Sequence, residues 1–109
     1  MNTPEFDEDG YPTEETLEKI KKWEYSDGWL ELMQFVGKAW HWPEYCTATD
    51  ALNYWDKPVL RYRLVTGGWS GNESIITALE GNFIFWNMCW QESHRGGKHI
   101  FEIKKSEAE

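Results

Sequence analysis

Residues suited to chemistry cluster in two glycine-bearing stretches, "GGWSGNE" over residues 67–73 and "SHRGGKH" over residues 93–99. A carboxylate and an imidazole can exchange protons near neutral pH, so Glu73 with His94 or His99 forms a candidate acid–base pair. Anion binding is the other chemistry suggested here, through polar side chains and the free backbone N–H groups of a helix N-terminus. The candidate ligand- or partner-binding residues are Trp69, Ser70, Asn72, Glu73, Ser93, His94, Arg95 and His99.

Neither stretch matches an established catalytic motif. The first lacks the lysine and the spacing of a phosphate-binding P-loop. Ser70 lies outside a G-x-S-x-G nucleophile elbow, because Asn72 stands where that motif has its second glycine. The three histidines and two cysteines show no metal-ligand spacing. We therefore expect no metal and no cofactor and assign no catalytic residue. Glycines in such stretches are more often simple turn residues than parts of an anion site.

The two stretches can act together only if the elements before them end at the same place. "VLRYRLVT" alternates apolar and polar residues and predicts a strand over about 58–66. "ESIITALE" predicts a helix over 72–80, which Gly81-Asn82 would end. Residues 83–93 fit either a strand or a continued helix, and we favour a strand because the glycine interrupts the helix and aromatic residues dominate.

"HIFEIK" predicts a last strand over 98–104, joined to the preceding strand by a hairpin. If the strands over 58–66 and 83–93 pair directly, the β-α-β connection makes them parallel. Both glycine-bearing stretches would then leave the sheet at its carboxyl edge, where ligands bind in such sheets.

The N-terminal half predicts two helices, over about 13–24 and 27–40, with capping residues before each and apolar residues at helical spacing. Residues 44–57 are compatible with a short helix from Thr49 to Trp55 or with a loop. The predicted fold class is therefore α+β, with a small three-stranded sheet packed by three helices. We expect residues 1–12 to be a flexible acidic arm, residues 13–104 a single domain, and residues 105–109 a solvated tail.

Charge and composition limit the classes of partner. The net charge is −8, and residues 1–27 supply most of it with nine acids and three lysines. Nucleic acid is not expected to bind directly, because phosphate neutralisation needs clustered Lys and Arg. The first predicted helix offers an acidic docking face, formed by Glu14, Glu15 and Glu18. An aromatic content of 17% is enough for a core and for a binding surface.

The sequence has no apolar stretch long enough for a membrane span and no signal peptide, which favours the cytoplasm. The sequence favours reduced, buried thiols at Cys46 and Cys89, and it is also compatible with a disulfide between them.

"GWSGNESIITAL" followed by "FWNMCWQESHRGGKHIFEI" resembles a family of small phage- and prophage-encoded proteins with no assigned activity. The resemblance spans roughly residues 66–103 and depends on Gly-Trp-Ser-Gly-Asn-Glu, the paired tryptophans and Arg-Gly-Gly. It implies an accessory or host-directed role.

These features favour a non-enzymatic acidic accessory protein that binds a protein partner. Such a protein could inhibit a host nucleic-acid-binding or defence protein by occupying its basic surface. A small-ligand or anion-binding site, or an enzyme, at the 67–73 and 93–99 edge is the first alternative. A structural virion component is the second. A homo-oligomer is compatible with each of these functions.

Overall fold

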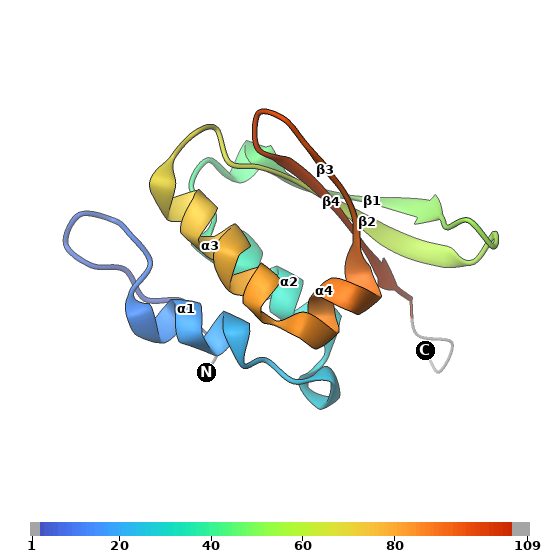
Figure 1. Cartoon of the computed structure of the whole chain (residues 1–109), viewed down its shortest axis with the longest axis horizontal. Helices are drawn as coiled ribbons and strands as arrows, with labels where there is room; N and C mark the ends of the chain where they lie inside the picture. Colours follow the sequence, from blue (N-terminus) through green and yellow to red (C-terminus); the bar gives the residue numbers. More distant parts are fainter. Residues whose placement is uncertain (1–2, 106–109) are drawn as a thin grey trace.

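The computed structural model describes residues 3–105, in which four helices lie on one side of a four-stranded antiparallel sheet (Figure 1). The helices are α1 (Glu14–Lys21), α2 (Trp29–Ala39), α3 (Ser70–Gly81) and α4 (Phe83–Cys89), with 3-10 turns at Tyr25–Asp27 and Pro43–Tyr45. The strands are β1 (Cys46–Leu52), β2 (Pro58–Val65), β3 (Trp90–His94) and β4 (Lys98–Lys104). The predicted α+β class is confirmed, and the sheet has one strand more than the three expected.

The strand predicted over residues 83–93 is wrong in its first half, because residues 83–89 form α4. Asn82 is the physical reason. Its side-chain oxygen accepts a hydrogen bond from the backbone N–H of Phe85 at 3.2 Å, which caps a new helix. Its side-chain nitrogen donates to the backbone carbonyls of Ile20 and Trp23 at 3.0 and 2.9 Å. Gly81-Asn82 therefore separates two helices instead of introducing a strand.

Residues 44–57, for which the sequence was compatible with a short helix or a loop, contain β1. Its residues pair with β2 without interruption, from Cys46 opposite Leu64 to Leu52 opposite Pro58. The side-chain oxygen of Asn53 accepts from the backbone N–H groups of Trp55 and Lys57, which closes the connecting loop. Pairing with β2 decides the conformation of a segment whose own propensity is weak.

The expected direct pairing of β2 with the strand after α3 is wrong, because β4 lies between β2 and β3. β4 is antiparallel to both, so that Tyr62 faces Phe101 and Ser93 faces His99. β2 and β3 therefore run in the same direction without touching, and their carboxyl ends still meet at one edge. The predicted hairpin between the last two strands is confirmed.

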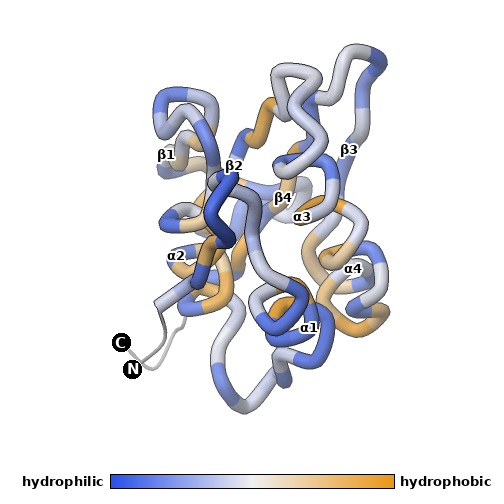
Figure 2. The backbone as a smooth tube through the Cα atoms, turned by 90° about the vertical axis from the view of Figure 1, so that its left-hand side faces the viewer, coloured by the Kyte–Doolittle hydropathy of each residue, from blue (hydrophilic) through white to orange (hydrophobic). Residues whose placement is uncertain are grey.

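The core lies between the helices and one face of the sheet. Its largest fully buried side chains include Phe85, Phe101, Leu64 and Leu79. Figure 2 shows hydrophobic positions on the helices and inner strands, and a further hydrophobic stretch along α4 at the margin of the molecule. Within residues 3–105, no helix lies on the other face of the sheet (Figure 1).

The N-terminal segment folds back on α1. Phe6 and Pro12 form an isolated β-bridge, which closes a short loop. The hydroxyl of Thr16 accepts from the backbone N–H of Glu5 at 2.8 Å and donates to its carbonyl at 3.1 Å. Of the arm expected over residues 1–12, the first two residues lie outside the described residues, as do residues 106–109 of the expected tail.

None of the helices within residues 3–105 is long and apolar enough to span a bilayer.

Candidate functional site

The two glycine-bearing bends lie side by side, as the sequence predicted, although the strands before them do not pair. The backbone N–H of Thr66, after β2, donates to the carbonyl of Gly97, after β3, at 3.0 Å. Gly97 has a φ of 88°. A Cβ atom there would collide with the side-chain oxygen of Thr66, so only glycine fits this close approach. The two bends therefore lie in contact at one edge of the sheet.

Aromatic rings line the first bend in an aromatic row, which we define as Tyr11, Trp69, His41, Trp42 and Tyr45. Trp69 stacks on His41 with ring centroids 4.5 Å apart and contacts Tyr11 at 4.8 Å. His41 in turn contacts Trp42 at 4.5 Å, and Trp42 contacts Tyr45 at 5.8 Å. Of these rings, only Trp69 was among the predicted binding residues, because the other four come from two separate segments, at residue 11 and over 41–45, and no local pattern joins them to Trp69.

Ser70, Asn72 and Glu73 do not form a shared polar site. Ser70 donates from its hydroxyl to that of Tyr11 at 3.3 Å. Asn72 is fully buried and binds backbone groups, so its amide is not free for a ligand. Glu73 is exposed, and in the described part of the chain no hydrogen bond or ion pair joins it to His94 or His99.

The second bend does bring two predicted residues together. The hydroxyl of Ser93 lies 2.7 Å from Nδ1 of His99, and the indole N–H of Trp90 donates to the same hydroxyl at 2.8 Å. Burial lowers the pKa of His99 below its ordinary value of 6.5, and the carboxylate of Glu80 partly opposes this. A neutral imidazole bonded to a hydroxyl can exchange a proton with it.

His94 and Arg95 take no part in this contact. His94 instead bonds the carboxylate of Glu92, 2.6 Å from its Nε2 atom. Arg95 lies exposed in the turn between β3 and β4. The eight predicted residues therefore share one edge of the sheet but divide into separate groups, and among them only Ser93 and His99 form a hydrogen bond between side chains.

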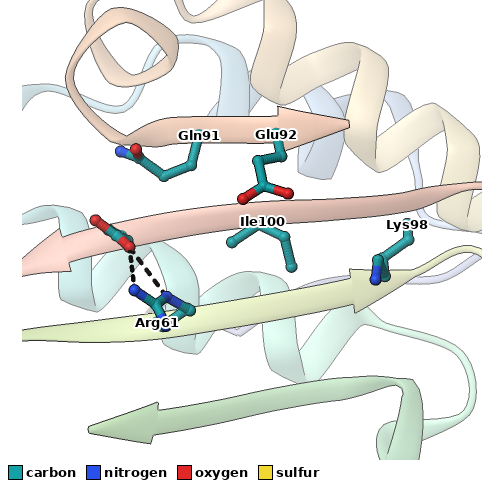
Figure 3. Close-up of a pocket in the computed structure, with 6 residues that line it drawn as sticks. Arg61, Gln91, Glu92, Lys98 and Ile100 are labelled. Carbon is teal, nitrogen blue, oxygen red and sulfur yellow. Dashed lines mark hydrogen bonds and ion pairs between the residues drawn. The ribbon is translucent and has the colours of Figure 1, made fainter. Parts of the chain in front are cut away.

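The uncovered face of the sheet carries a shallow hollow of about 310 Å³ (Figure 3). Its centre is an ion pair in which two nitrogens of Arg61 donate to one carboxylate oxygen of Glu102, at 3.0 and 2.7 Å. The lining residues are Arg61, Gln91, Glu92, Lys98, Ile100 and Glu102. The lining carries two basic and two acidic side chains, so the hollow offers a ligand little net field.

The three glutamates of the predicted acidic face lie around a second hollow of about 500 Å³, with Leu17 among them. Glu18 also pairs with Lys22 at 3.1 Å across one helical turn. Both side chains are exposed, so this pair contributes little to stability. The acidic face stays open to solvent.

Helix α4 exposes an apolar surface that sequence reasoning missed. Phe83, Ile84 and Met88 are 73%, 61% and 52% exposed, while Phe85 on the opposite side is fully buried. Trp29 links this surface to Tyr25, since its indole N–H donates to the sulfur of Met88 at 3.3 Å and its ring lies 6.0 Å from that of Tyr25. We call the four exposed residues, Tyr25, Phe83, Ile84 and Met88, the α4 patch.

The two cysteines are free thiols, which answers the disulfide question left open by the sequence. Burial raises the pKa of Cys46 to about 11 and that of Cys89 to about 12. Neither thiol is therefore activated as a nucleophile. Within the described residues, no group of three His, Cys, Asp or Glu side chains is placed to hold a metal ion.

Comparison of the chain with protein-family models, with curated proteins and with solved structures finds no match.

Proposed function

We propose that this chain is a protein-binding domain that docks on its partner through the α4 patch. The observation that carries the proposal is the exposure of Phe83, Ile84 and Met88 on a helix whose other side is also apolar. Six of the seven residues of α4 are apolar, with the exposed Asn87 as the exception, and a helix this apolar is normally buried on most of its sides. Contiguous exposed apolar residues on a folded surface mark interaction sites.

Helix α1, which carries the acidic face, and helix α4, which carries the α4 patch, both lie along the lower margin of the molecule in Figure 1. Asn82, at the start of α4, joins the two helices by its hydrogen bond to the carbonyl of Ile20. A partner that covers both surfaces would need an apolar groove bordered by Lys and Arg. Complementary charge would speed encounter and exclude other partners, while the apolar contacts would supply most of the affinity.

A basic border of this kind is typical of surfaces that bind nucleic acid. The proposed role is therefore an accessory protein of phage type, whose carboxylates take the place of phosphates on a host nucleic-acid-binding or defence protein. Binding would then compete with nucleic acid. The net charge of −8 supports this role, because a protein with that charge would itself be repelled by phosphates.

Site-specific photo-cross-linking tests the proposal. A photoreactive residue at position 84 should capture one partner in cells that carry the gene, and a photoreactive residue at the exposed position 77 of α3 should not. Ile84→Asp should then weaken binding of the purified partner about 30-fold or more, because loss of a central apolar contact costs about 2 kcal/mol. Thr77→Asp is the matched control. Equal capture at both positions, or equal affinity of both variants, would refute docking through α4.

The contact between Ser93 and His99 favours a second candidate, a small-anion site or proton-transfer site at the bend before β4. Titration with inorganic phosphate should produce saturable shifts in the NMR signals of the His99 ring, and Arg95→Ala should weaken them. Unchanged His99 signals throughout the titration would remove this candidate.

A further inference from the structure

The two edges of the sheet differ in how well they are protected against pairing with another strand. β3 has five residues, an irregular register between Trp90 and Glu92, and a charged pair formed by Glu92 and His94. Short length, a bulge and charged side chains all discourage edge-to-edge pairing. β1 has seven residues in uninterrupted register and contains no proline, lysine or bulge.

β1 is also accessible from both faces of the sheet. Five of its seven residues are exposed, and the other two are half-buried. Figure 1 shows β1 at the outer margin of the sheet; its first residue, Cys46, lies beside Gly37 of α2, and the rest of the strand extends away from the helices. Its only charged residue, Asp50, pairs with Lys105 of the same chain. A further strand can therefore approach this edge without meeting a helix or an unpaired charge.

We propose that β1 pairs antiparallel with β1 of a second copy of this chain, which would give one continuous eight-stranded sheet. A two-fold axis through Thr49 places all seven residues in register, with Cys46 opposite Leu52 of the other copy. It also places Asp50 opposite Ala48, so no like charges face each other directly. A two-fold axis through Asp50 would instead set two carboxylates opposite each other.

The exposed aromatic residues at both ends of β1 support this register. Tyr54 and Trp55, in the loop after β1, are 91% and 73% exposed. Trp42 and Tyr45, just before β1, are 37% and 42% exposed. Because Leu52 would face Cys46 of the other copy, the loop of each copy would lie beside the Trp42–Tyr45 segment of its partner. Aromatic contacts at both ends of the paired strands are typical of interfaces with a few dominant residues.

Charge placed on the two-fold axis tests the proposal. The wild-type chain should dimerise in sedimentation equilibrium, with an affinity that rises with salt because two chains of net charge −8 repel each other. Thr49→Lys and Thr49→Glu should each be monomeric, since like charges would meet on the axis. An equimolar mixture of the two should again dimerise, since opposite charges then face each other. Trp55→Ala should weaken the dimer about tenfold, and Thr77→Lys on α3 should leave it unchanged.

Hydrogen exchange provides a readout that needs no variant. Backbone amides of β1 should lose protection on dilution of the wild-type chain, while those of β3 should not. A wild-type chain that stays monomeric at all concentrations overturns the proposal. So does a dimer that survives Thr49→Lys, or one that Ile84→Asp disrupts, because association through the α4 patch would explain it instead. Failure of the β1 dimer leaves docking through α4 untouched, since the two surfaces share no residue.

Discussion

The side chain of Asn72 binds both backbone groups of His41. Its oxygen accepts from the His41 N–H at 2.9 Å, and its nitrogen donates to the His41 carbonyl at 3.1 Å and to the Thr66 carbonyl at 3.3 Å. One buried amide therefore joins the start of α3 to the chain after α2 and to the end of β2. Its role at the predicted site is to position the aromatic row.

We expect Asn72→Ala to lower the free energy of unfolding by about 3 kcal/mol, because it leaves buried backbone groups without partners. Urea denaturation measures this loss. Ser70→Ala, two residues earlier in the same helix and exposed, is the matched control and should change stability by less than about 0.5 kcal/mol. Equal effects of the two substitutions would show that the Asn72 bonds are not needed.

Gly96 and Gly97 provide a matched pair that tests the contact between the bends. Both have a positive φ, at 92° and 88°, so alanine is strained at either position. Only at Gly97 would the added Cβ collide with Thr66, whereas nothing lies near it at Gly96. Gly97→Ala should therefore cost about 2 kcal/mol more than Gly96→Ala in thermal or urea unfolding. Equal losses would indicate that the bends are not in contact.

Acid should lower the free energy of unfolding, because His99 binds a proton more readily in the unfolded chain. Because burial lowers the pKa of this residue in the folded state, the unfolded chain binds its proton more readily. The free energy of unfolding should therefore be highest above a pH of about 6.5, the pKa that His99 has in the unfolded chain. It should decline as the pH falls below that value. Urea midpoints measured between neutral and mildly acid pH should fall more steeply for the wild-type chain than for His99→Gln. Parallel profiles would contradict this prediction.

The two thiols should resist modification in the native protein. With a pKa of about 11, Cys46 is ionised in only about one molecule in a thousand at pH 8, and Cys89 in fewer still. A disulfide reagent such as DTNB should therefore react slowly with the folded chain and rapidly after denaturant is added. Rapid labelling of either thiol in the native state would contradict the burial of its side chain.

The sequence predicted well those elements whose local pattern and tertiary environment agree. Alternation over "LRYRL" identified β2, and helical spacing with capping residues identified α1, α2 and α3. The common edge of the two bends was predicted from direct parallel pairing of β2 with the next strand, and that pairing is wrong; the bends still share an edge because β2 and β3 run in the same direction. β4, which separates them, changes their pairing but not that direction.

The errors occurred where contacts distant in sequence decide the structure. Asn82 ends one helix and begins the next because it also binds Ile20 and Trp23, about 60 residues earlier in the chain. The spacing of Phe85 and Cys89, both buried, was the local signal for α4, but the density of aromatic residues favoured a strand. The stacking of His41 on Trp69 has no local signal at all.

The position of β4 has a consequence for how the chain is made. β4 is the last of the described strands to leave the ribosome, yet it lies between β2 and β3 and carries Phe101 and Ile103 into the core. Until it emerges, the edges of β2 and β3 that face β4 are unpaired, and Phe85 and Trp86 lack their contact with Phe101. The domain must therefore complete its sheet in one late step, and during synthesis its aromatic residues are open to chaperones.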